Sequence, residues 1–207
     1  MKLSVVLFAL LISQNIIAQK EDFRELDHES FFRIGAKAGV NINKIQGQSY
    51  KSGFNYNYLL GGFMQFNFSK RFGIQPEVNF VQSSSEFTND PSDIYNDLFR
   101  DGTQKSAKLS YLKIPLLLNI NVGQSKHVKL QIGPQFGGLL KETVDSLKAN
   151  RDIFKKAEWS AVGGLWLQIP FINLGGRYEL GLSNINAVDN KEKWKNQGFT
   201  FFAGFTF

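Results

Sequence analysis

The sequence contains no cysteine among its 207 residues. This absence excludes a disulfide scaffold, a thiolate metal site, a cysteine nucleophile and the lipid-anchored N-terminus of a lipoprotein. Proline is also scarce, with 5 residues, whereas the chain has 20 Phe and 19 Gly. After the first 19 residues, no stretch approaches the roughly 18 consecutive apolar residues of a transmembrane helix. This balance favours β-structure with close backbone approaches over a helical bundle.

The first 19 residues have the pattern of an export signal. Lys2 supplies a positive start, residues 3–12 form an apolar run, and Ala18 is a small residue before a plausible cleavage point. The apolar run is about half the length of roughly 20 residues that a membrane-spanning helix needs. We therefore predict a signal peptide over residues 1–18 that is cleaved after Ala18, a periplasmic lead-in over 19–30, and a single barrel domain over 31–207.

Apolar and polar residues alternate in eight later segments. The last is the clearest, because Phe199, Phe201, Ala203, Phe205 and Phe207 fall on one face. A segment of about ten residues has the length of a tilted transmembrane strand. The phase of the sixth segment is the least regular, since two large apolar residues fall among its polar positions, Val162 and Trp166. The predicted strands lie near 31–41, 58–68, 72–85, 108–121, 128–140, 157–168, 172–182 and 198–207.

The connections between these segments alternate strictly in length. Four are long and polar, near 42–57, 86–107, 141–156 and 183–197, and the three between them are short turns. An up-and-down barrel of the outer membrane has this asymmetry, with tight periplasmic turns and long external loops. We predict an all-β, eight-stranded antiparallel transmembrane barrel whose first and eighth strands pair, because lipid permits no open sheet edge. The alternative is a lipocalin-like barrel with its apolar face inward around a small ligand, in the periplasm or secreted.

The polar face of the strands carries eight charged residues that would share the barrel interior. Apolar side chains lie on the same face, and an eight-stranded barrel is just wide enough for its own side chains. We therefore expect a packed salt-bridge plug, with a small polar conduit as the alternative. The predicted interior network consists of Arg33, Lys37, Glu77, Lys113, Lys129, Glu158, Arg177 and Glu179. The apolar residues expected to fill the space around it are Leu59, Phe63, Val81, Leu117 and Phe202.

Three blocks of the sequence form a recognisable series: 111–118, YLKIPLLL; 177–185, RYELGLSNI; and the closing strand 198–207. They resemble, in this order, blocks of the PorT-type outer-membrane β-barrel proteins of Bacteroidetes. The resemblance covers roughly residues 31–207 and implies an eight-stranded barrel, with some members associated with secretion or gliding machinery. Lys113 departs from the pattern, because the family more often carries an acidic residue at this position.

No residue pattern points to catalysis or to a bound cofactor. The only histidines, His28 and His127, lie before the first predicted strand and after a short turn, away from the external rim where a barrel enzyme would hold its base. The acidic residues of the second long loop lack the spacing of a calcium loop. We expect no enzyme, no cofactor and no metal site, and an exported protein integral to the outer membrane with a structural or interaction role.

The predicted partners follow from this location. The third and fourth long loops are basic, and basic residues at an outer rim can contact anionic lipid headgroups. Phe201, Phe205 and Phe207 share one face of the last strand and resemble the signal that the outer-membrane insertion machinery reads in its clients. Other envelope proteins are further candidate partners. Nucleic acid is not, because its binding needs a contiguous basic face with stacking aromatic residues.

Overall fold

The computed structural model describes residues 30–51, 53–87, 106–123, 127–145, 152–189 and 191–207, which form eight β-strands. The predicted signal peptide and all but the last residue of the predicted lead-in lie outside the described residues. No helix in the described ranges is long and apolar enough to cross a membrane. The strands are β1 (Phe32–Gln46), β2 (Asn55–Asn67), β3 (Phe72–Glu86), β4 (Ser106–Asn121), β5 (Val128–Val144), β6 (Ala157–Gln168), β7 (Ile172–Gly181) and β8 (Lys195–Thr206).

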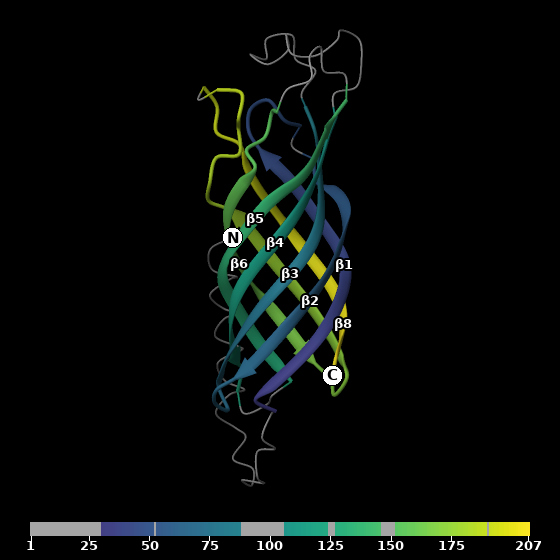
Figure 1. Cartoon of the computed structure of the whole chain (residues 1–207), viewed down its shortest axis with the longest axis vertical. Coiled ribbons are helices and arrows are strands. Elements are labelled where there is room, and N and C mark those ends of the chain that lie inside the picture. The colour runs from purple at the N-terminus through teal and green to yellow at the C-terminus, as the bar shows by residue number, and fades with distance from the viewer. Residues whose placement is uncertain (1–29, 52, 88–105, 124–126, 146–151, 190) are drawn as a thin grey trace, which may run out of the picture.

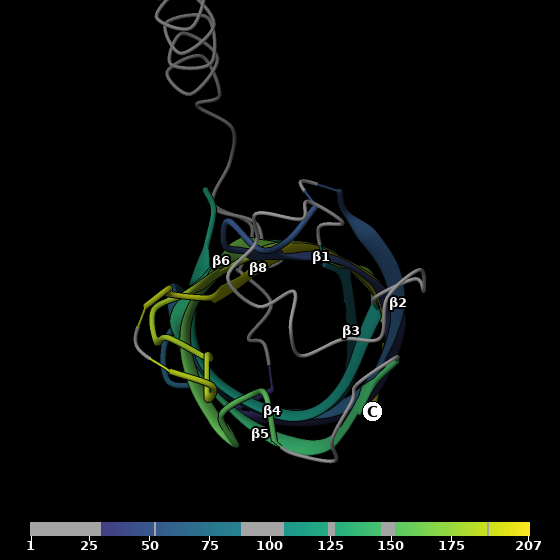
Figure 2. The same ribbon diagram turned by 90° about the horizontal axis from the view of Figure 1, so that it is seen from above.

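The eight strands form one closed barrel in sequence order. Each strand pairs antiparallel with its neighbours along the chain, and β1 pairs with β8 from Gly35 opposite Thr206 to Gln46 opposite Lys195. The strands run obliquely around the long axis (Figure 1), and the view along that axis shows a closed ring (Figure 2). The prediction of an eight-stranded antiparallel up-and-down barrel is confirmed, and the pairing of β1 with β8 leaves no open edge.

The two faces of the wall differ sharply in polarity. Large apolar residues are exposed on the outside, as Phe201 is with 54% of its surface accessible, whereas charged residues such as Glu77 lie buried inside. A lipocalin-like barrel would have the opposite arrangement, so that alternative is wrong. The two irregular residues of β6, Val162 and Trp166, point inward with their polar neighbours. The alternation of inward and outward side chains therefore continues through β6, and these two apolar side chains help to fill the lumen.

Several strands continue further at the long-loop end than the sequence predicts. β1 extends to Gln46 and β5 to Val144, and β8 begins at Lys195. The pairing persists there, but outward-facing residues become polar, as at Lys44 and Gln46. The alternation of apolar and polar residues therefore fades before the hydrogen bonding does. The predicted long loops were too long for this reason.

Candidate functional site: a filled lumen beneath a folded crown

Three charged residues meet in the lower lumen, each from an inward position of a different strand. Lys37 of β1 approaches Glu77 of β3, with its Nζ 2.5 Å from Oε2. Arg177 of β7 reaches the same carboxylate with both nitrogens of its guanidinium, Nη1 to Oε2 and Nη2 to Oε1, each at 2.8 Å. One carboxylate thus joins three strands across the barrel, and its partners arrive in the forked geometry that makes such pairs strong.

Amide side chains complete the surroundings of this group. Gln75 donates from Nε2 to Oε1 of Glu77 at 2.7 Å, and Gln131 accepts from Nε of Arg177 at 2.9 Å. Asn119 donates to Gln75 and accepts from Gln131, at 2.8 and 2.7 Å. All three amide side chains are buried. A buried charge is tolerated when its remaining hydrogen-bonding positions are occupied, and this amide layer occupies several of them.

Aromatic rings fill the lumen beside the charges. Trp166 lies 5.0 Å from Phe63 and 5.5 Å from Phe202, measured between ring centroids. The guanidinium of Arg177 lies 4.6 Å from the centroid of Phe202, and Nζ of Lys37 lies 4.4 Å from the same centroid. The three rings fill the space, and Phe202 also presents the negative face of its ring to Lys37 and Arg177. The prediction that Phe63 and Phe202 fill the interior is confirmed, as it is for three further buried residues, Leu59, Val81 and Leu117.

A second charged group lies elsewhere in the lumen, around Lys113 of β4. Its Nζ is 2.5 Å from Oε1 of Glu179 and 3.2 Å from Oε1 of Glu158. Asn196 donates to the other oxygen of Glu158 at 3.3 Å. All three charged side chains are almost fully buried. Lys113, where the sequence departs from the resemblance, is therefore paired with two glutamates.

The predicted network has two further members. Lys129 is fully buried in the lumen. Arg33 is only partly buried and lies at the short-turn mouth, where it donates to the carbonyl of Pro170 at 3.1 Å. The predicted network is thus two separate clusters of three residues, one further buried lysine and one residue at the mouth. Phe201, Phe205 and Phe207 all face outward and are exposed.

At the long-loop end, aromatic side chains from the connections between strands form a folded hydrophobic cluster, which we call the crown. The indole of Trp194 is at its centre, 5.1 Å from Tyr50, 5.6 Å from Phe154 and 6.1 Å from Phe87. These four come from the four long connections and are all buried. The rest of the buried cluster consists of Ile45, Ala107, Leu109, Tyr111, Ile153 and Ile185.

Hydrogen bonds tie the connections of the crown to one another. The carboxylate of Glu192 accepts from the backbone amide of Gln48, and from the amide and hydroxyl of Ser49 at 3.1 and 2.6 Å. Another carboxylate, that of Glu142, accepts from the amides of Ile153 and Phe154 at 2.9 and 3.3 Å. The first connection is therefore fastened to the fourth, and the third to the end of β5.

The crown was not predicted from the sequence, because the long connections that form it are polar overall. Its aromatic residues are single and widely spaced, so they show no period of two or 3.6. The available signal was the presence of Tyr50, Phe87, Phe154 and Trp194 within otherwise polar stretches. Large aromatic side chains in a polar connection are most economically explained by burial against one another. In the part of the chain that the structure describes, no three His, Cys, Asp or Glu side chains gather as a metal site requires.

A closed eight-stranded barrel that is apolar outside and polar inside defines an integral outer-membrane barrel protein. The chain belongs to the family described as the outer membrane protein beta-barrel domain, which matches residues 17–187. A comparison with curated proteins finds no match. Because the protein is integral to the outer membrane, its long-loop end faces the exterior and its short-turn end the periplasm.

Solved structures of similar fold agree with this class. The attachment invasion locus protein Ail of Yersinia pestis, in complex with the heparin analogue sucrose octasulfate, is 14% identical with a TM-score of 0.53, over 86% of this chain and 100% of that one. OprG of Pseudomonas aeruginosa is 14% identical with a TM-score of 0.51, over 88% of this chain and 98% of that one. At this identity the similarity concerns the fold alone.

Proposed function

We propose that the protein is a non-enzymatic, plugged barrel whose external connections, held together by the buried crown, form a rigid interaction surface for other components of the cell envelope. The observation that carries this proposal is the convergence of four external connections on Trp194. A surface that is held by a hydrophobic core loses little conformational entropy when a partner binds, which favours recognition. The two lumen clusters below it are built for rigidity, because each charge is paired and buried.

The plug is tested by conductance. The purified protein, inserted into planar lipid bilayers, is expected to give no stable current steps, while a large-pore porin inserted in the same way gives them. Regular steps from the wild-type barrel would contradict a filled lumen and support the polar conduit. If steps do appear, their ion selectivity tests the role of Lys113, because a lysine that lines a pore favours anions.

The interaction surface is tested by cross-linking in intact cells. A photoreactive amino acid at the exposed Lys193, which precedes Trp194 of the crown, is expected to capture specific neighbours. The same group at the exposed Lys70, at the periplasmic end, should capture a different set. Identical neighbours at both positions would indicate random collision. Capture at neither position would refute the proposed role of the crown.

We also propose that the protein is of the PorT type and enters the membrane through the insertion machinery that reads its last strand. The blocks at 111–118, 177–185 and 198–207 support the first point. The outward exposure of Phe201, Phe205 and Phe207 supports the second, because a receptor could reach all three rings. A role within a secretion assembly is the finer form of this proposal, and the neighbours captured by cross-linking would identify it.

A further inference from the structure

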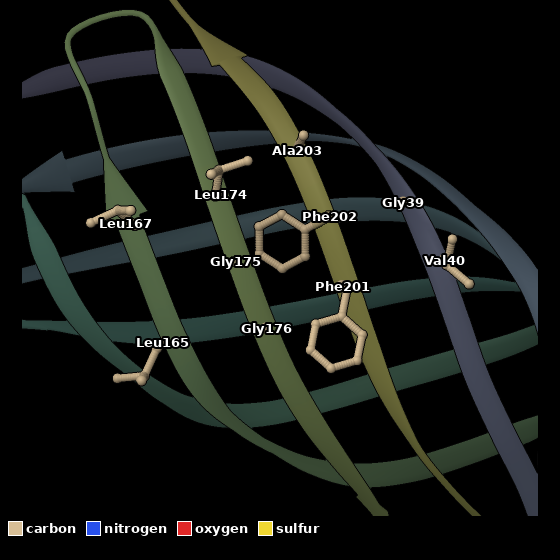
Figure 3. Close-up of a pocket in the computed structure, with 10 residues that line it drawn as sticks. All are labelled: Gly39, Val40, Leu165, Leu167, Leu174, Gly175, Gly176, Phe201, Phe202 and Ala203. Atoms are coloured by element: carbon tan, nitrogen blue, oxygen red, sulfur yellow. The ribbon is translucent and has the colours of Figure 1, made fainter.

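Two hollows lie on the same wall of the barrel, one at the external rim and one in the apolar belt below it. The lower hollow has a volume of about 490 Å³ and lies across β6, β7, β8 and β1 (Figure 3). Its volume falls within the range of about 300–1,000 Å³ that is typical of small-ligand sites. It opens to the lipid phase between exposed apolar side chains of the outer face, and its lining also includes the buried Phe202. The exposed lining residues are Val40, Leu165, Leu167, Leu174 and Phe201.

The lower hollow exists because small residues interrupt a wall of large ones. Along one row of paired strands, Val40, Phe201, Gly176 and Leu165 face outward side by side. Gly176 has no side chain, and the ring of Phe201 leans toward it, because a Cβ atom at this position would lie 3.2 Å from that ring. The neighbouring row holds two further small residues, Ala203 and Ala38, beside Leu174. Figure 3 shows Phe201 and Leu165 on opposite sides of the bare backbone at Gly176.

The upper hollow, of about 660 Å³, is rich in lysine. Lys191, Lys193 and Lys195 line it together with the end of β1. Lys44 faces outward from β1 and pairs with Gln197, two pairs along from Gln46 and Lys195. Lys44 and Lys195 are therefore diagonal neighbours on the outer face, roughly 7–8 Å apart.

Two carboxylates of the fourth connection lie near these lysines. Both accept hydrogen bonds from the backbone, Glu192 from Gln48 and Ser49, and Asp189 from the amide of Lys191 at 3.0 Å. The four lysines, Lys44, Lys191, Lys193 and Lys195, outnumber these two carboxylates. This part of the rim therefore carries a net positive charge.

The spacing between the hollows matches one lipid leaflet. Lys195 and Phe201 are six residues apart on β8, which corresponds to about 20 Å along the strand. With a strand tilt of roughly 40°, the vertical separation is about 15 Å, half of the approximately 30 Å hydrocarbon thickness. Phe199 and Tyr178, whose ring centroids are 4.9 Å apart, lie between the two levels on the same outer wall, a position typical of interfacial aromatic residues.

We infer that this wall binds one anionic lipid of the outer leaflet, with a phosphate-bearing headgroup at Lys44, Lys193 and Lys195 and an acyl chain in the hollow at Gly176 and Ala203. Charge complementarity at the rim and the apolar hollow at acyl depth select this occupant. A soluble anion would use only the upper hollow, and a second copy of the chain would not need the lysines.

The test measures lipid retention by native mass spectrometry of the full barrel in detergent. The probes are dipalmitoylphosphatidic acid and dipalmitoylphosphatidylcholine, which share their acyl chains and differ in net charge. One molecule of phosphatidic acid is expected to bind, about tenfold more tightly than phosphatidylcholine. Inorganic phosphate and dihexanoylphosphatidic acid, which lack long chains, are expected to compete weakly. Full competition by phosphate, equal binding of both long-chain lipids, or a dimer without lipid would overturn the inference.

Matched variants separate the headgroup from the chain. The double variant Lys193→Gln/Lys195→Gln is expected to weaken phosphatidic acid binding about tenfold and leave phosphatidylcholine unchanged. Ala203→Trp should weaken both by filling the lower hollow. The controls Lys108→Gln and Ala161→Trp, which alter outward positions away from the two hollows, are expected to match the wild type.

Folding of each variant is confirmed by its altered gel migration without boiling. If Ala203→Trp does not fold, Ala203→Leu takes its place. Equal losses in the controls and the site variants would show nonspecific binding and refute the site.

Discussion

Arg177 and Glu77, 100 residues apart in the sequence, are joined across the lumen by two parallel hydrogen bonds of 2.8 Å. The contact links β7 to β3, which are not neighbours in the barrel. This ion pair connects opposite parts of the wall, which the pairing of adjacent strands does not do. The same carboxylate holds Lys37 of β1, so the cluster braces three parts of the wall.

Removal of Arg177 is therefore expected to destabilise the barrel strongly. Arg177→Ala leaves the Glu77 carboxylate buried with one cation fewer, and the loss of one partner of a buried pair costs about 3–5 kcal/mol. The free energy of unfolding, measured by denaturant titration in detergent micelles, should fall by that amount. The control Lys156→Ala removes an exposed ion pair with Asp152 and should have almost no effect. Equal stability of Arg177→Ala and the wild type would show that the cluster does not brace the wall.

Adjacent glycines of β2 provide a sharp test of the crowded lumen. Gly61 faces inward, and a Cβ atom there would lie 2.8 Å from the carbonyl oxygen of Val78 and too close to Asn79. Gly62 faces outward, where the nearest atom would be 3.6 Å away. Gly61→Ala is expected to cost about 1–3 kcal/mol through overpacking. Gly62→Ala should be neutral or stabilising by about 0.5–1 kcal/mol, because alanine restricts the unfolded chain. Equal effects of the two in denaturant titrations would contradict the close packing inside.

The barrel could be predicted from the sequence because the lipid belt imposes a strict period of two. The pairing of the charged residues in the lumen could not be predicted, because it depends on how far neighbouring strands are staggered. Lys113 illustrates this limit, because its sequence position indicated an inward lysine but gave no sign that Glu158 and Glu179 converge on it. The crown had no periodicity at all, and its centre at Trp194 is fixed only by contacts among connections distant in sequence.

The crown should open without unfolding of the barrel. Trp194→Ala removes the ring that contacts Tyr50, Phe87 and Phe154, and deletion of a buried Trp costs about 3–5 kcal/mol. A loss of about 3 kcal/mol from the local stability corresponds to about a hundredfold faster cleavage of the connections by trypsin on intact cells. The heat-modifiable gel migration should persist.

Trp159→Ala is the matched control for the crown. Trp159 is exposed on the outer wall, and its loss should leave the rate of cleavage unchanged. If both variants are cleaved at the wild-type rate, Trp194 does not hold the crown together. If Trp194→Ala also loses its heat-modifiable migration, the crown and the barrel form one cooperative unit.

The role of Phe207 can be separated into its ring and its backbone. Phe207 is 83% exposed, and its backbone amide donates to the carbonyl of Ile34 at 2.8 Å, which helps to close β8 against β1. Phe207→Ser keeps this hydrogen bond and removes the ring. If the insertion machinery reads the ring, the variant should accumulate less in the outer membrane of cells, yet refold from urea into micelles at the wild-type rate. Deletion of Phe207 should impair both, because the backbone hydrogen bond to Ile34, which adds to the pairing of β8 with β1, is lost as well. Normal assembly of Phe207→Ser in cells would show that the insertion machinery does not read the ring. Slow refolding of this variant into micelles would show that the substitution acts on the folding of the barrel itself.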